Sequence, residues 1–378
     1  MITYFRTPPE HRGKSRVMWC AGALAICFCI LALLGLAAIR GQASSIPGSD
    51  AAARWTAEDS PHTYAQISVC YGDDRAFNLE TLYMRRAELE KSLTENAVAP
   101  ENDRARLYLD CYSGETQATL STSRTDISAR ITAAGGNFFF FHPAELICGS
   151  YFSEDGELPY TVVLDDNAAW QLFGALDVAG MEVTICGQPF RITGVVKAPR
   201  DALSVSAYGD EVRAYVNYVG MRLAAGIDRI TDYEILLQNP IKNFARDSVM
   251  TAFSVQKDDP GVKISDSTTR FGFETLTDQI PDFFSRAMRT DSVIPPWWEN
   301  LARVAEYKAV AWAAFTSVTG ILSAVLLIVF LSLWFYIHPV KVKNIYGYFE
   351  EKAERKRMKN WLLKKKAEQE RAALKAEK

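Results

Sequence analysis

Two uncharged segments limit how this chain can fold. Val17–Ile39 and Ala309–Ile337 run for 23 and 29 residues without one Asp, Glu, Lys or Arg. A helix of about 20 apolar residues spans the hydrocarbon core of a bilayer, so both segments are long enough to cross it. Neither segment has the polar face that a helix on the surface of a water-soluble core would need. We therefore expect two transmembrane helices.

The first segment has one alternative interpretation, a cleaved signal peptide. Basic residues precede it, and the small residues of the stretch GQASS follow it. Its apolar run is longer than the roughly 7–15 residues of the hydrophobic region in such peptides. This length favours an uncleaved anchor.

The charges divide the chain into parts of opposite sign. Residues 1–16 hold 4 basic residues against 1 acidic, residues 338–378 hold 13 against 6, and the remainder holds 25 against 38. Basic flanks of membrane helices stay in the cytoplasm. Both termini are therefore predicted to lie on the cytoplasmic side of a bacterial inner or plasma membrane. The predicted parts are a cytoplasmic N-terminus (1–16), a first span (17–39), an acidic extracytoplasmic domain (40–308), a second span (309–337) and a basic cytoplasmic tail (338–378).

Short strand and helix patterns alternate along the outer segment. The pattern predicts an α+β fold with a mixed sheet, arranged as one body or as two lobes. The basic balance that marks a nucleic-acid-binding surface is missing from this segment. We expect strands at 62–72, 105–114, 116–123, 213–220 and 232–240, helices at 78–97 and 242–253, and a hairpin at 180–196 that turns at Gly187 and Gln188.

Four consecutive phenylalanines, Phe138–Phe141, follow the pair Gly135-Gly136. Such a run could form an aromatic patch for a ligand. A strand buried on both faces is the more ordinary explanation, and it is the one we expect.

Four cysteines lie in the outer segment, where disulfides can persist. Four cysteines allow three pairings, and the sequence does not choose among them. Four free thiols on strands are an equally good interpretation. The four residues are Cys70, Cys111, Cys148 and Cys186.

Two adjacent carboxylates, Asp165 and Asp166, stand between a strand pattern and a helix pattern. A metal ligand or a general acid could occupy such a place. A helix N-cap also needs a side-chain oxygen there, because the first N–H groups of a helix have no partners. Gly174 suits the left-handed residue after the helix, and Trp170 and Phe173, three residues apart, are expected on its buried face. We therefore expect a cap rather than catalysis.

An ordered series of motifs from residue 145 to 220 resembles the MacB-like periplasmic core domain, found in ABC-transporter permeases that include FtsX and LolC relatives. The family pattern has a glycine, an aromatic and an acidic turn, then an aliphatic strand, a helix ending in Leu-Phe-Gly, a glycine-led hairpin and a last strand. The stretch PPWWENLARVAE also resembles the membrane-proximal helix of such permeases. The matching positions are Gly149, Phe152, Asp155, Val162–Leu164, Leu172–Gly174, Gly180–Val196 and Tyr215–Tyr218.

The sequence also departs from the family pattern in its number of spans. Such permeases usually have four spans, three of them after the outer domain, whereas this sequence has one span after it. The resemblance therefore implies that the chain pairs with a multi-span permease subunit and a separate cytoplasmic ATPase, or with a second copy of itself. Stripes of small residues in the spans would allow close helix packing. They are Ala21, Ala25 and Cys29, and Ala313, Ser317, Gly320 and Ala324.

The motifs of common enzymes are missing from the sequence. It contains no GxxxxGK[ST], GxSxG or HExxH. His62 and His142 lack the spacing of zinc ligands, and two adjacent aspartates are too few ligands for a metal. We expect no catalytic residues, no metal and no cofactor.

These observations favour a non-enzymatic membrane subunit of an ABC-type export or mechanotransmission complex. Its outer domain would dock a partner or substrate and relay motion across the membrane. The alternative is a freestanding extracytoplasmic binding or sensor protein without an ATPase partner. A membrane-bound enzyme is the least favoured class.

Overall fold

The computed structural model describes residues 12–46, 48, 50–56, 60, 62–100, 105–152, 158–209, 211–256, 259–283, 293–338, 351–363 and 365. The chain divides into two compact units. We call residues 33–317 the sheet unit, and residues 1–32 together with 318–378 the helix unit. The long helices α1 (Arg12–Ser44) and α11 (Trp297–Ile337) contribute to both.

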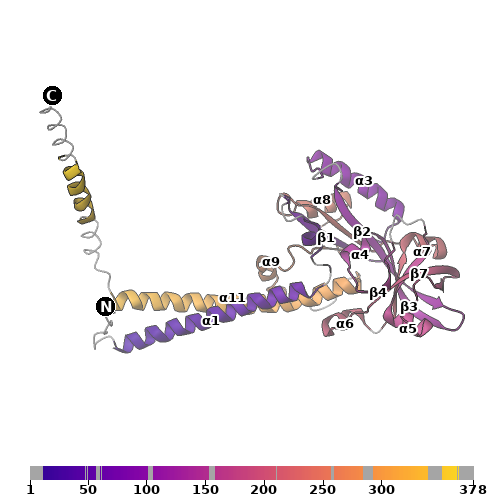
Figure 1. The fold of residues 1–378 in the computed structure, drawn as a ribbon, viewed down its shortest axis with the longest axis horizontal. Coiled ribbons are helices and arrows are strands. Elements are labelled where there is room, and N and C mark those ends of the chain that lie inside the picture. The colour runs from indigo at the N-terminus through magenta and orange to yellow at the C-terminus, as the bar shows by residue number, and fades with distance from the viewer. Residues whose placement is uncertain are drawn as a thin grey trace, which may run out of the picture. The chain divides into compact units, whose positions relative to one another are not determined.

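A mixed ten-stranded sheet forms the centre of the sheet unit (Figure 1). The strand order is β10-β1-β9-β2-β3-β8-β5-β7-β4, and β6 pairs with both β2 and β7. Two pairs are parallel, β3 with β8 and β5 with β7, and the other pairs are antiparallel. The strands are β1 (Tyr64–Tyr71), β2 (Tyr108–Ser121), β3 (Asp126–Gly136), β4 (Leu146–Gly149), β5 (Thr161–Asp165), β6 (Glu182–Ile185), β7 (Gln188–Val196), β8 (Arg213–Asn217), β9 (Asp232–Gln238) and β10 (Val262–Asp266).

Strand β6 closes six strands into a ring. Leu120 and Ser121 at the end of β2 pair with Ile185 and Thr184, and β6 continues into β7 through a tight hairpin. The ring therefore runs β2-β3-β8-β5-β7-β6 and returns to β2. The predicted α+β fold with a mixed sheet is confirmed, and one sheet runs through the whole unit.

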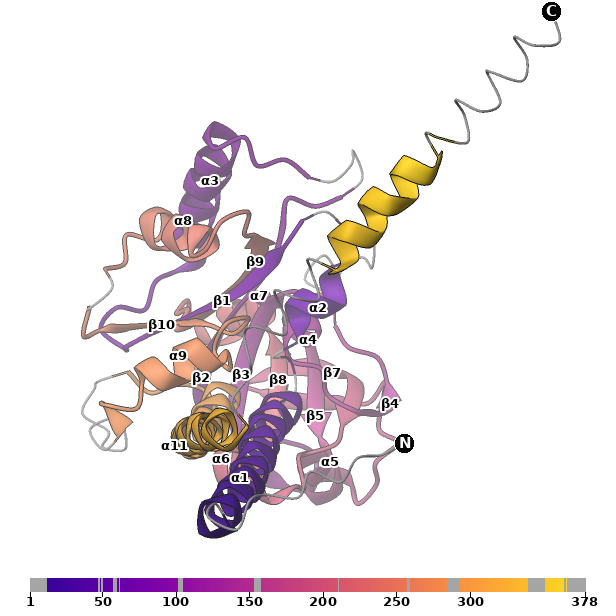
Figure 2. The ribbon, with the colours of Figure 1, turned by 90° about the vertical axis from the view of Figure 1, so that its left-hand side faces the viewer.

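Helices cover both faces of this sheet. Helices α3 and α8 pack side by side over β1 and β9 (Figures 1 and 2). The opposite face carries α2, α4 and the first turns of α11. Burial on both faces explains why every residue of β1 and β9 is buried. The shorter helices are α2 (Ala51–Trp55), α3 (Leu79–Glu95), α4 (Phe138–Phe141), α5 (Asp166–Phe173), α6 (Ala202–Tyr208), α7 (Tyr218–Ala225), α8 (Phe244–Ala252) and α9 (Phe273–Asp278).

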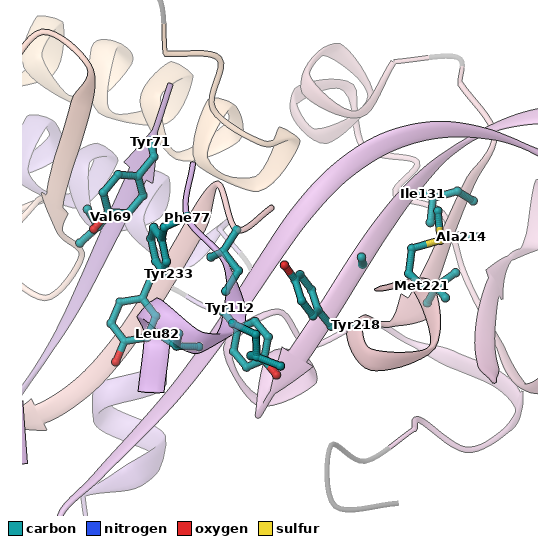
Figure 3. Packing of buried hydrophobic residues seen from close by; sticks show 14 of the residues in the cluster. Val69, Tyr71, Phe77, Leu82, Tyr112, Ile131, Ala214, Tyr218, Met221 and Tyr233 are labelled. Atoms are coloured by element: carbon teal, nitrogen blue, oxygen red, sulfur yellow. The ribbon is translucent and has the colours of Figure 1, made fainter. Parts of the chain in front are cut away.

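A continuous apolar core lies beneath α3, α8, α5 and α7. Tyr112 and Tyr218 lie at its middle with ring centroids 5.1 Å apart, between a group around Tyr233 and a group around Ile131 (Figure 3). The leucines predicted on one face of 78–97 supply the α3 side of this core: Leu79, Leu82, Leu89 and Leu93. Burying each such side chain stabilises the fold by about 1.5–3 kcal/mol.

The structure corrects the prediction for Phe138–Phe141. These residues form the short helix α4, not a strand, because Gly136 with a φ of 66° ends β3 just before them. The rings then point in different directions: Phe138 packs on Trp298, Phe139 on Tyr151 and Phe140 on Trp55. Four apolar residues cannot distinguish a strand from a helical turn by periodicity alone.

Three strand boundaries also differ from the prediction. Residues 108–121 form one strand, β2, where two strands were predicted at 105–114 and 116–123, because the ion pairs of Glu115 with Arg130 and Arg213 allow a charged residue within it. Gly114 permits this course, since a Cβ there would lie 2.2 Å from the Arg229 carbonyl oxygen. The hairpin turns at Cys186 and Gly187, and the strand predicted to reach Gly220 ends at Asn217, whose side chain caps α7.

Each predicted span lies within one helix, α1 or α11, and both helices are long and apolar enough to cross a membrane. Within the helix unit they pack against one another. Trp19 meets Phe330 and Trp334 at centroid distances of 6.1 and 6.3 Å, and Ser323 donates a hydrogen bond to the Ala25 carbonyl. Ala21 and Ala25 are buried in this way, whereas Cys29 and Ala324 remain exposed.

Candidate functional site

Asp165 and Asp166 both perform structural tasks. Asp165 Oδ1 accepts from the Ala168 N–H at 2.6 Å, so it is the predicted N-cap of α5. Its Oδ2 accepts from the Arg213 N–H and the Tyr208 hydroxyl at 3.0 and 3.1 Å. Burial raises the pKa of Asp165 to about 6, although these hydrogen bonds act in the opposite direction.

Asp166 ties α5 to the segment after β7. Its Oδ1 accepts from the Ala198 N–H at 3.0 Å, and its Oδ2 lies 2.7 Å from the Arg200 guanidinium. The predicted left-handed residue after α5 is confirmed at Gly174, with a φ of 68°. The prediction for Trp170 was wrong: its side chain is 63% exposed, and Ala168, Ala169 and Leu172 form the buried face instead. Phe173 is half-buried against the core.

The four outer cysteines have free thiols, and the strand register separates Cys70 from Cys111 and Cys148 from Cys186. Cys70 and Cys111 are buried on β1 and β2, which are separated by β9. Cys148 lies opposite Val195 at one end of β7, while Cys186 lies in the turn at the other end. Seven residues of strand separate Gln188 from Val195, about 23 Å, far beyond the Cα separation of a disulfide.

Buried charges join the first turns of α11 to the sheet unit. The Arg270 guanidinium makes two hydrogen bonds to the Glu299 carboxylate, at 2.7 and 2.9 Å, and one to Glu306 at 2.8 Å. Arg303 and the Ser265 hydroxyl also donate to Glu299, each at 3.2 Å. Arg270 and Glu299 are only 7% and 6% exposed as side chains. Removing one member of such a pair leaves a buried charge without its partner, so α11 is tightly fixed here.

A second polar group lies beside it, at the centre of the β9 strand. Glu234 accepts from the Trp298 indole N–H at 3.1 Å and from the Gln66 amide at 3.3 Å. His142 Nε2 lies 3.0 Å from the same carboxylate, and its ring packs 4.5 Å from Trp298. Burial acts to raise the pKa of Glu234, but the His142 charge and the hydrogen bonds from His142 and Gln66 together lower it.

Sequence reasoning missed both groups, because their members are far apart along the chain. The one local signal was a charged residue inside an otherwise apolar strand, as in Asp232-Tyr233-Glu234. Asp232 on this strand is also buried, and burial raises its pKa to about 8. Within the described residues there is no cluster of three His, Cys, Asp or Glu side chains that could hold a metal ion. What the two groups do on the described residues is attach the first turns of α11 to the sheet through buried ion pairs and hydrogen bonds.

Residues 23–252 match the family model of the MacB-like periplasmic core domain. The chain belongs to this family. The resemblance seen at residues 145–220 is thereby confirmed, and it extends from the first apolar helix to the end of α8. This MacB-like chain is thus a membrane protein of the ABC-transporter permease class, with one apolar helix before the strands of its sheet in the sequence and one after them.

Solved structures with similarity to this MacB-like chain include two domains of transporters. The extracellular domain of the noncanonic ABC-type transporter YknZ from Gram-positive bacteria is 12% identical, with a TM-score of 0.37 over 53% of this chain and 99% of that one. The periplasmic region of MacB from Actinobacillus actinomycetemcomitans is 15% identical, with a TM-score of 0.38 over 54% and 89%. A comparison with curated proteins finds no match.

Proposed function

We propose that this chain is a non-enzymatic subunit of an ABC-type export or mechanotransmission complex. Its sheet unit docks a partner or substrate, and α11 relays the resulting motion across the membrane. A multi-span permease subunit and a cytoplasmic ATPase, or a second copy of the chain, complete the assembly. Family membership supports this class of function.

The observation that carries the relay is the continuity of α11. The same helix, Trp297–Ile337, begins in the buried ion pairs of Arg270 and Glu299 and includes the whole predicted second span. Sharp kinks in a helix occur almost always at Pro, at Gly–Ser pairs or at a bulge. Gly320 is the one glycine in α11, and no proline interrupts it. Motion of the sheet unit would thus be passed along a stiff element.

Co-purification tests the proposal. The full-length chain, tagged and gently solubilised from its own membrane, should bring down a protein with Walker motifs and a permease with several spans. A tagged membrane protein of similar abundance serves as the control for non-specific capture. Recovery of the chain alone or with copies of itself, at all detergent concentrations that keep α11 folded, would contradict the ATPase partnership.

A further inference from the structure

A cavity of about 330 Å³ lies in the sheet unit beside the start of α11. Five aromatic side chains line it, and four of them are at least nine-tenths buried: Phe138, Tyr208, Tyr215 and Trp298. Trp297 is the fifth. Binding sites for small molecules typically have volumes from about 300 Å³ upward and apolar, aromatic walls. The size and lining of this cavity therefore match a ligand site rather than a packing defect.

The walls come from elements that the rest of the structure already holds rigid. Phe138 and Trp298 pack edge to face at 5.4 Å, and Tyr208 and Trp297 pack edge to face at 5.0 Å. The Tyr208 hydroxyl is held by Asp165, and Trp298 is held by Glu234. The aromatic walls are thus fixed by hydrogen bonds outside the cavity, which leaves the cavity preformed.

The charged residues that line the cavity already have partners. Lys197 is paired with Glu145 at 2.9 Å, and Arg200 is paired with Asp166 at 2.7 Å. Asp201 caps α6 by accepting from the Ser204 N–H. His142, a further lining residue, faces Glu234. A charged ligand would therefore meet only side chains that are already paired, and would gain less from them than from an unpaired counter-charge. This smaller gain favours an uncharged ligand.

The ligand's size and its one polar contact follow from the same residues. An apolar cavity of about 150 Å³ binds benzene, so a cavity of twice that volume has room for two rings. The Trp297 indole nitrogen is shielded from solvent, and its interaction with the Tyr215 hydroxyl falls short of hydrogen-bond geometry. An acceptor oxygen on the ligand would satisfy this N–H.

We propose that this cavity binds an uncharged two-ring apolar molecule that carries one hydrogen-bond acceptor. The site goes beyond the proposed function, because it would exist whether or not an ATPase is present. Since Trp297, Trp298 and Leu301 belong to α11, a bound molecule contacts both that helix and the sheet face. Occupancy therefore stabilises the contact between them.

Benzophenone is a suitable probe, because it has two rings, a carbonyl acceptor and the ability to cross-link to nearby C–H bonds under near-ultraviolet light. Full-length protein in lipid nanodiscs is irradiated over a range of benzophenone concentrations, and cross-linked peptides are mapped by mass spectrometry. Saturable cross-links are expected in peptides that contain Tyr208 and Leu301. Diphenylmethanol should compete, and the charged diphenylacetate should compete about tenfold less well, a difference of about 1.4 kcal/mol.

Ala198→Phe fills the cavity and should abolish the saturable cross-links. Ala144→Phe, at a second lining position, is the substitute if the first variant does not fold. Ser206→Phe adds the same ring to an exposed position on α6 and should leave the cross-links unchanged. Cross-links found only in the apolar parts of α1 and α11, or unaltered in a folded cavity-filled variant, would overturn the proposal. Equal competition by diphenylacetate would overturn the neutral ligand class.

Discussion

Buried charge, not apolar contact alone, fixes the first turns of α11 to the sheet unit. The Arg270 guanidinium forms ion pairs with two carboxylates, those of Glu299 and Glu306, and its side chain is almost fully buried. Each buried charge has lost its hydration, and only its partners compensate for that loss. The group is therefore stable only when every partner is present. Single substitutions here are therefore expected to cost far more than substitutions of surface pairs.

Arg270→Met should destabilise the protein by roughly 3–5 kcal/mol, because it leaves Glu299 and Glu306 buried without their main counter-charge. Lys242→Met removes one member of the exposed Lys242–Glu274 pair and should cost less than about 1 kcal/mol. The measurement is urea unfolding of the full-length protein in micelles, followed by near-ultraviolet circular dichroism. Equal losses in the two variants would show that the buried group does not hold α11.

Asp232 should make stability depend on pH. Its pKa is raised to about 8 by burial, above the ordinary value near 3.9, so the folded state binds a proton that unfolding releases. Its contribution is therefore complete below about pH 4 and is lost as the pH rises towards 8. Between pH 6 and 8 the wild type should lose up to about 2 kcal/mol through this residue.

Asp232→Asn removes the titration and should flatten the stability profile over that range. The amide oxygen of the introduced side chain can still accept the hydrogen bond that the Thr231 hydroxyl gives to Asp232. Asp73→Asn, at a side chain that is 86% exposed, is the matched control and should leave the profile unchanged. The same urea titration at pH 6, 7 and 8 measures both variants. If the stability of Asp232→Asn falls with pH as steeply as that of the wild type, Asp232 is not the group responsible.

Residue roles set by near neighbours in sequence could be predicted, whereas those set by the fold could not. Asp165 and Gly174 stand at the two ends of one helix, so cap chemistry alone identified them. The exposure of Trp170 depends on which face of α5 meets the sheet, and its apolar character gave the wrong answer. The pairing of Arg270 with Glu299 joins residues from a turn and a distant helix, and no local sequence pattern predicts it.

At the scale of elements, the hairpin and the long strands followed from alternation and turn residues. The hairpin of β6 and β7 lies within the predicted bounds, with its turn shifted by one residue. Helix α4 was missed because four apolar residues fit a strand or a helical turn equally well, and the unbroken β2 was missed because the partners of its Glu115 come from other strands. Strand order could not be predicted either, since it is decided by contacts between elements rather than within them.

Helix α11 allows a test of the relay at this scale. Four glycines inserted after Ala305 should uncouple the two parts of α11, because a flexible linker replaces a stiff helix there. In the complete complex, an ATP analogue should change amide hydrogen exchange at Trp297–Leu301 in the wild type but not in this variant. The same insertion after Arg124, in the exposed turn between β2 and β3, should leave the response intact. A response that survives the insertion after Ala305 would exclude α11 as the relay.

At the scale of the whole molecule, the predicted topology places residues 40–308 outside the cytoplasm. The exposed thiol of Cys186 reports on it directly. In intact cells or spheroplasts a membrane-impermeant maleimide should label Cys186, and Cys186→Ser should remove that signal. A cysteine introduced as Asn360→Cys in the basic tail should react only after permeabilisation. Reactivity in the reverse order would invert the predicted orientation.

The ring that β6 closes also bears on how this protein avoids aggregation. Closing six strands leaves β4 and β10 as the outer strands of the described sheet, and they are only four and five residues long. Short edges offer few unpaired amides to an incoming strand. Neighbouring copies crowded in one membrane would thus be poor templates for one another, and recognition of a partner would depend on side chains rather than on strand addition.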